Sequence, residues 1–61
     1  MVEVAEKDQG TVYDLADIHR IRVAHVPFSR TLLWIIGHGP NVMDFLHELK
    51  AMVECKVFGR G

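Results

Sequence analysis

The side chains best able to do chemistry in this chain are four histidines and one cysteine, scattered along the sequence: His19, His25, His38, His47 and Cys55. Zinc sites in short chains usually take their ligands from two closely spaced pairs, and these residues form no such pattern. Asp44 and His47 are three positions apart on a helical segment and could share a ligand, but a solvated pair has the same spacing. We therefore predict neither a metal nor a bound cofactor.

A catalytic site is equally poorly specified. A nucleophile and bases could come from Ser29, His38, Asp44, His47 and Cys55, but such a site is defined by geometry that the sequence does not fix. Cys55 lies one position off the apolar stripe of its segment, which is typical of a half-buried, unreactive thiol. A chain of 61 residues also lacks the volume of an ordinary ligand pocket unless two subunits form it together. We therefore assign no catalytic residue and favour a protein that is not an enzyme.

The segment 37–41, Gly-His-Gly-Pro-Asn, separates an apolar run from a helical pattern. Free backbone N–H groups at a helix start bind anions, so a ligand turn would use Gly37, His38, Gly39 and Asn41. The spacing departs from that of a dinucleotide-binding turn, because Val42 occupies the place of the third glycine. The structural alternative is that the glycines end the strand and the Pro-Asn pair begins the helix. A very small enzyme or ligand carrier with its site at this turn is one functional hypothesis.

Three arginines, Arg20, Arg22 and Arg30, are the only basic residues between positions 18 and 40. If Arg20 and Arg22 lay on one strand they would point the same way, and a two-stranded ribbon can enter a nucleic-acid groove. Residues 1–17 carry five acidic side chains against one lysine, and the whole chain has a net charge of −1. This balance makes a weak electrostatic footprint for nucleic acid. A nucleic-acid-binding oligomer is therefore an alternative hypothesis.

The elements that position these groups are clearest between residues 32 and 56. Residues 32–36, Leu-Leu-Trp-Ile-Ile, are short, apolar and partly β-branched, which predicts a buried strand over 31–37. Residues 41–55 repeat apolar side chains at helical spacing, which predicts an amphipathic helix with Asn41 as its N-cap. The apolar stripe of that helix comprises Val42, Phe45, Leu46, Leu49, Met52, Val53 and the stem of Lys56.

Residues 11–28 permit two interpretations. Thr11 and Asp14 form a pair like a capping box, which favours a helix. The alternation of Ile21-Arg22-Val23-Ala24-His25-Val26 favours a strand from 18 to 26, preceded by one helical turn at 12–16. We adopt the strand for 18–26 and leave open whether residues 11–20 are helix or strand. The four-residue connection 27–30 then makes 18–26 and 31–37 an antiparallel hairpin.

The two faces of this hairpin would both be apolar. Pairing Val26 with Thr31 places one set of side chains on the face that the helix covers: Ile21, Val23, Leu32, Trp34 and Ile36. The opposite face carries Ala24, Val26, Leu33 and Ile35, next to Arg22. One helix covers one face only, so we predict that these four apolar residues meet a second copy or another protein. The alternative is that the N-terminal segment folds back over them.

The fold class predicted from these elements is α+β: a small antiparallel β-hairpin followed by one amphipathic helix and completed by oligomerisation. The expected organisation is a flexible tail at 1–10, one domain at 11–58 and a loose end at 59–61. The expected core contains residues from all three elements: Val23, Leu32, Trp34, Ile36, Phe45, Leu46, Leu49 and Val53. A core this small is marginally stable, and the single cysteine excludes an intrachain disulfide.

These observations favour a small protein-interaction module, a regulator or inhibitor that binds another protein and forms a homodimer. The N-terminus is acidic and lacks the apolar stretch of a secretory leader. The longest apolar run is far shorter than the ~20 residues that span a membrane. We therefore expect a cytoplasmic protein with no membrane partner.

Overall fold

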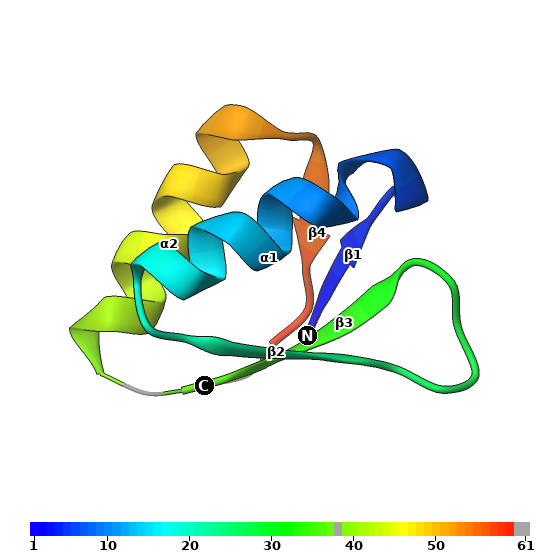
Figure 1. The fold of residues 1–61 in the computed structure, drawn as a ribbon, viewed down its shortest axis with the longest axis horizontal. Helices are drawn as coiled ribbons and strands as arrows, with labels where there is room; N and C mark the ends of the chain where they lie inside the picture. The colour runs from blue at the N-terminus through cyan, green and yellow to red at the C-terminus, as the bar shows by residue number, and fades with distance from the viewer. Residues whose placement is uncertain (38, 60–61) are drawn as a thin grey trace.

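The computed structural model describes residues 1–37 and 39–59 as a four-stranded antiparallel sheet with two helices. The elements in chain order are β1 (Val2–Val4), the short 3-10 helix η1 (Glu6–Asp8), α1 (Gln9–Ile18), β2 (Arg22–His25), β3 (Leu32–Ile36), α2 (Pro40–Met52) and β4 (Cys55–Val57). Both helices lie on the same side of the sheet (Figure 1). The α+β class and the hairpin followed by a helix are thus confirmed, with two further strands and a second helix.

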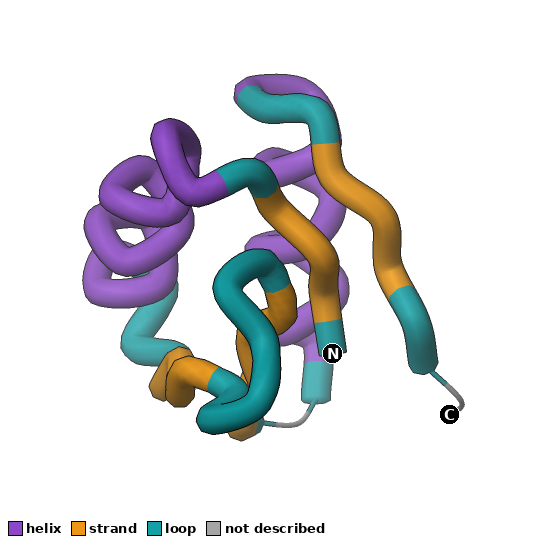
Figure 2. Tube along the Cα trace, turned by 90° about the vertical axis from the view of Figure 1, so that its right-hand side faces the viewer, coloured by secondary structure: helices purple, strands orange, loops and turns teal. Residues whose placement is uncertain are grey.

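The strand order is β2-β3-β1-β4, with antiparallel pairing between each pair of neighbours. Each long helix therefore connects two strands that have a third strand between them: α1 joins β1 to β2 around β3, and α2 joins β3 to β4 around β1. This is the doubled split β-α-β, or ferredoxin-like, topology. It places the first and the last strand side by side, because β1 pairs with β4 (Figure 2).

Residues 11–18 belong to helix α1, and His19 and Arg20 form the turn that ends it, which resolves the open question in the sequence. Helix α1 ends at Ile18, and Arg20 follows in the left-handed conformation, with φ 59°. The Ile21 amide donates to the Ala16 carbonyl at 2.8 Å, and the Arg20 amide donates to that of Asp17 at 3.1 Å. These two bonds form a Schellman motif, which turns the chain sharply out of the helix. The predicted strand 18–26 is therefore wrong over its first residues, and β2 begins at Arg22.

The core lies between the sheet and the two helices. Helix α1 contributes Val12, Leu15 and Ala16, and α2 contributes Phe45 and Leu49, the two most buried positions of its stripe. The strand side chains that meet them come from all four strands: Val2, Val4, Val23, Leu33, Ile35, Cys55 and Val57. Phe45 and Leu49 confirm the predicted helix stripe, and Val23, Leu46 and Val53 pack against the core as half-buried residues.

The register of the hairpin differs by one residue from the predicted register. Val23 pairs with Ile35 and Ala24 with Trp34, whereas the sequence-based pairing placed Val23 opposite Trp34. Because side chains alternate along a strand, a shift of one residue exchanges the two faces of β3. Leu33 is fully buried and Trp34 is 42% exposed. The prediction that Leu32, Trp34 and Ile36 belong to the helix-covered core is therefore wrong.

The segment expected to be a flexible tail, 1–10, contains an inner strand of the sheet. Val2 and Val4 are almost completely buried, and β1 pairs with β3 on one side and β4 on the other. The Gln9 side-chain amide donates to the carbonyls of Val4 and Arg30, at 3.1 and 2.6 Å. The prediction of a tail is therefore wrong for β1, which completes the sheet, and for the start of α1, which begins at Gln9.

Helix α2 spans Pro40–Met52 rather than 41–55, and its N-cap is Gly39 rather than Asn41. Gly39 has φ 82° and ψ −167°, a conformation that side chains other than hydrogen disfavour, and Pro40 then suits the first helical position. At the other end Val53 is extended, and Cys55, predicted to be the last residue of the helix, begins β4. Met52, predicted within the apolar stripe, is 54% exposed.

Candidate functional site: the uncovered sheet face

The face of the sheet turned away from the helices is the largest feature that the fold leaves unexplained. Strand alternation places on it Arg22 and Ala24 from β2, Leu32, Trp34 and Ile36 from β3, Glu3 from β1 and Lys56 from β4. Met1 and Phe58 extend β1 and β4 on the same face, because the Phe58 amide donates to the Met1 carbonyl at 2.8 Å. We call this set of nine residues the outer face.

An apolar row crosses all four strands of the outer face. Ala24 pairs with Trp34, and the registers of β1 place Met1 beside Trp34 and Phe58 beside Met1. Trp34, Met1 and Phe58 are each 42–43% exposed. Ile36, next to this row, is 51% exposed. Together these four side chains expose several hundred Å², the size of the largest apolar patch on a typical monomer, and such patches are often functional.

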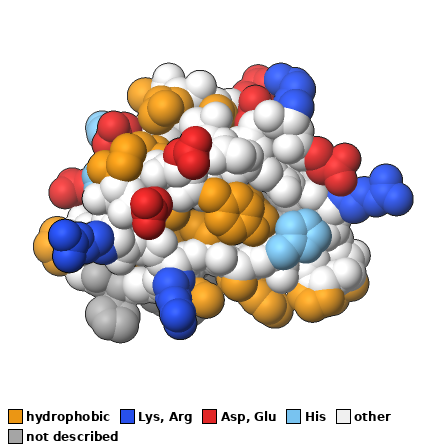
Figure 3. Space-filling model, in the orientation of Figure 1, with side chains coloured by type: hydrophobic (Ala, Val, Ile, Leu, Met, Phe, Trp, Pro, Cys, Tyr) orange, Lys and Arg blue, Asp and Glu red, His pale blue; other side chains and the backbone are white. Residues whose placement is uncertain are grey.

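Three charged residues border the apolar row at two opposite corners. Arg22 stands at one corner, paired with Ile36 across β2 and β3. Glu3 and Lys56, which pair with each other across β1 and β4, stand at the other. Glu3 also accepts a hydrogen bond from the Thr31 hydroxyl at 3.4 Å. Apolar side chains are visible along the lower margin of the space-filling view, on the side of the sheet away from the helices (Figure 3).

The residues predicted for the uncovered face do not form it. Leu33 and Val26 have no exposed surface, and Ile35 is half-buried on the helix side of the sheet. Of the four predicted residues only Ala24 is both on the outer face and partly exposed, because Val26, which follows Ala24 by two positions and donates its amide to the Leu32 carbonyl at 3.2 Å, is completely buried. The sequence predicted that the sheet would have a second apolar face that helices do not cover, and the structure has such a face. The one-residue register shift changes which residues are exposed on it.

The structure does not gather the three arginines. Arg22 lies in β2 on the outer face, whereas Arg20 lies in the turn that ends α1. Arg30 lies in the connection between β2 and β3, at the end of the hairpin opposite to Arg22. The expectation that Arg20 and Arg22 point the same way from one strand is therefore wrong, and Arg22 is the only one of them on the outer face.

The 37–41 turn has a structural explanation for both of its glycines. A Cβ atom on Gly37 would lie 3.1 Å from Cγ2 of Val42, so Gly37 lies close against the start of α2. Gly39 supplies the positive φ. Asn41 lies in the first turn of α2, two residues after the N-cap Gly39. His38, the remaining residue of the predicted ligand turn, lies outside the described residues.

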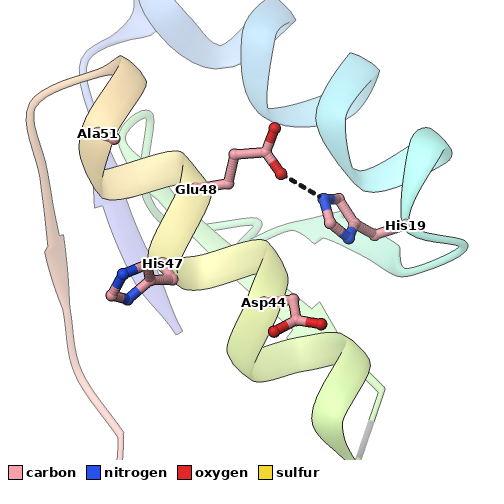
Figure 4. A pocket seen from close by; sticks show the side chains of 5 residues that line it. All are labelled: His19, Asp44, His47, Glu48 and Ala51. Atoms are coloured by element: carbon pink, nitrogen blue, oxygen red, sulfur yellow. Dashed lines mark hydrogen bonds and ion pairs between the residues drawn. The ribbon is translucent and has the colours of Figure 1, made fainter.

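A shallow depression between α1 and α2 gathers the described residues with the clearest proton chemistry. It is lined by His19, Asp44, His47, Glu48 and Ala51 (Figure 4). The His19 Nε2 atom lies 2.8 Å from Glu48 Oε1, and the His19 ring packs edge-on against Phe45, with centroids 6.0 Å apart. His47 points away from this pair (Figure 4). The His19–Glu48 contact joins the residue that follows α1 to helix α2.

Cys55 faces the core side of β4 and is half-buried. Burial raises the pKa of the Cys55 thiol above its ordinary value, and the positive charge of Lys50 partly offsets this effect. A raised pKa keeps the thiol protonated and weakly nucleophilic at neutral pH. Within residues 1–37 and 39–59, no three His, Cys, Asp or Glu side chains are grouped to hold a metal.

The fold and this surface define the chain as a small ferredoxin-like α+β domain with an exposed apolar sheet face. Comparison with protein families, with curated proteins and with solved structures finds no match to the chain. In the part of the chain that the structure describes, neither helix has the length and apolar character needed to cross a bilayer.

Proposed function

We propose that this protein is a non-enzymatic interaction module that binds protein through its outer face, as a small regulator or inhibitor. The observation that carries the proposal is the exposure of Trp34 in the middle of the sheet, 42% of its surface, beside the exposed Ile36 and Met1. Tryptophan is enriched among the residues that dominate binding energy at protein interfaces, particularly near their centres. The cytoplasm, where a single unpaired thiol stays reduced, is the proposed location.

The proposal is tested by affinity capture from the native cells with three baits: the wild-type chain, Trp34→Arg and Ile18→Arg. Ile18 is the matched control, because it is an apolar side chain on α1, 74% exposed and away from the sheet. We expect the same bound proteins on the wild type and Ile18→Arg, and their loss on Trp34→Arg. Partners that persist on Trp34→Arg would contradict the proposal.

Nucleic-acid binding through the outer face is the alternative to the proposed protein binding. Trp34 and Phe58 could stack on bases beside Arg22 and Lys56, but Glu3 interrupts this surface and Arg30 is remote from it. Retention on single-stranded RNA that weakens with salt, and is lost in Arg22→Ala, would favour the nucleic acid over a protein partner.

A further inference from the structure

We infer that the occupant of the outer face is a second copy of this chain, packed face to face about a two-fold axis over Trp34. The inference rests on the proposed function and specifies its partner. The observation behind it is the arrangement of charge around Trp34, which follows from the strand registers.

Trp34 lies at the midpoint between Arg22 and Glu3. Arg22 lies on β2, the neighbour of β3 on one side. It pairs with Ile36, two residues from Trp34 toward the C-terminal end of β3. Glu3 is one strand to the other side, on β1, and pairs with Leu32, two residues from Trp34 in the opposite direction. The two opposite charges therefore stand at equal and opposite displacements from the indole.

This placement makes the face self-complementary. A two-fold axis in the plane of the interface, passing over Trp34 and perpendicular to the Arg22–Glu3 diagonal, lays each chain's Arg22 on the partner's Glu3. The contact forms twice, and the two Trp34 side chains meet at the centre. From ordinary strand spacings, the strands of the two sheets then cross at about 70°, close to the orthogonal class of sheet packing. A two-fold contact of this kind needs only one patch.

The size of the face sets the strength of association. Four strands about 4.8 Å apart and at most five residues long cover at most about 320 Å² in projection, well below the ~800 Å² per partner of a standard interface. The dimer should therefore be weak and concentration-dependent, and its specificity should come from the two charge pairs more than from area.

Charge exchange tests the geometry. Arg22→Glu leaves two acidic residues on the face beside Lys56, and Glu3→Arg leaves three basic ones, Lys56 included. Each variant alone therefore opposes like charges at positions 3 and 22 twice. We expect each to weaken self-association by about tenfold or more. An equimolar mixture of the two variants restores both pairs, between unlike chains. The double variant Arg22→Glu/Glu3→Arg restores them between like chains.

The measurement is sedimentation equilibrium of each sample from about 10 µM to 1 mM, a range that brackets a weak dimer. We expect twice the 6.9 kDa mass for the wild type, the mixture and the double variant, and a monomer for each single variant. Recovery in the mixture also shows that the single variants are folded. Lys7→Glu, an exposed charge change off the sheet, should leave the wild-type dimer intact.

Two results would overturn the inference. A wild type that stays monomeric at the highest concentration excludes the second copy. If proteins that depend on Trp34 are still captured, the proposed function stands with a different partner. A dimer that is unaffected by either charge change, or is not recovered in the mixture, excludes this arrangement. A dimer that also survives Trp34→Arg excludes the outer face as the self-association surface. The proposed function falls only if capture of other proteins also persists on Trp34→Arg.

Discussion

At the scale of single residues, backbone geometry explains the two sharp turns that set the topology. Arg20 and Gly39 are the described residues with positive φ, and each adjoins the end of a long helix. Arg20 ends α1 within a Schellman motif, and Gly39 precedes α2. Without these turns neither helix could reverse onto the sheet, so the residues matter for the fold and not for binding chemistry.

Replacing Gly39 by alanine should lower the free energy of unfolding by about 1–3 kcal/mol, because φ 82° with ψ −167° is open essentially to glycine alone. Gly10→Ala is the control. Gly10 lies in α1 with no atom within 4 Å of where a Cβ would stand. That change should raise stability by about 0.4–1 kcal/mol. Urea unfolding of the two variants measures both effects, and equal stability for Gly39→Ala and wild type would contradict the strain.

The Cys55 thiol should react with iodoacetamide more slowly in the native chain than in the urea-unfolded chain, with its rate rising at higher pH. The reason is that burial raises the pKa of Cys55, and only the thiolate attacks. Lys50→Gln removes the offsetting charge and should slow the native reaction further. Native and unfolded thiols that titrate together would contradict the effect of burial.

The same shift predicts how stability depends on alkaline pH. A folded-state pKa above the unfolded value means that the native chain holds the thiol proton more tightly. The contribution is complete below the unfolded pKa and is lost as pH rises through the folded pKa. A Cys55→Ala variant should show a smaller alkaline loss of stability than the wild type in parallel thermal melts.

At the scale of elements, the register of β3 decides which side chains form the core and which form the surface. Leu33 pairs with Val2 of β1, and its side chain faces the helices, whereas the side chain of the next residue, Trp34, faces outward. Both sets are apolar, so neither composition nor alternation within β3 distinguishes them. The helix side is identified by the buried valines of β1, which share the face of Leu33.

Leu33→Ala should therefore cost about 2–5 kcal/mol of stability, the usual range for emptying a fully buried leucine site. Trp34→Ala should cost about 1 kcal/mol or less in the monomer, because it removes cross-strand contacts on a partly exposed face. Urea unfolding below the concentration of self-association compares the two. A larger loss for Trp34→Ala would indicate the alternative register.

At the scale of the whole molecule, the N-terminal strand β1 links the two parts of the sheet. A domain of this length has a stability of only about 3–9 kcal/mol, so one inner strand is a large share of it. β1 has three residues, yet it joins the hairpin to β4 and supplies two of the most buried side chains.

The double variant Val2→Ser/Val4→Ser should remove most of this stability, since exposing or replacing each buried valine costs about 1.5–3 kcal/mol. Glu6→Ser/Lys7→Ser is the control, because both side chains are exposed and lie just beyond the strand. Thermal melts followed by far-ultraviolet circular dichroism distinguish them. A folded Val2→Ser/Val4→Ser chain would show that the first residues are dispensable, as a flexible tail would be.

The sequence alone determined the features that depend on local periodicity. The helical stripe with Phe45 and Leu49 and the β-branched runs on either side of residues 27–30 are each visible within a short window. They lead to an α+β class and to an apolar sheet face that helices leave uncovered. No such signal exists for β1, whose three residues resemble a tail until they pair with partners about thirty and fifty-five positions away.

Only the tertiary structure decided which side of β3 is buried. A one-residue shift exchanges Leu33 and Ile35 for Trp34 and Ile36, and because both pairs are apolar the exchange buries no polar group. The choice is made by contacts distant in sequence, where Val2 meets Leu33 and two helices converge on the same side. The outer face, with Trp34 between Arg22 and Glu3, exists only once four separate segments are aligned.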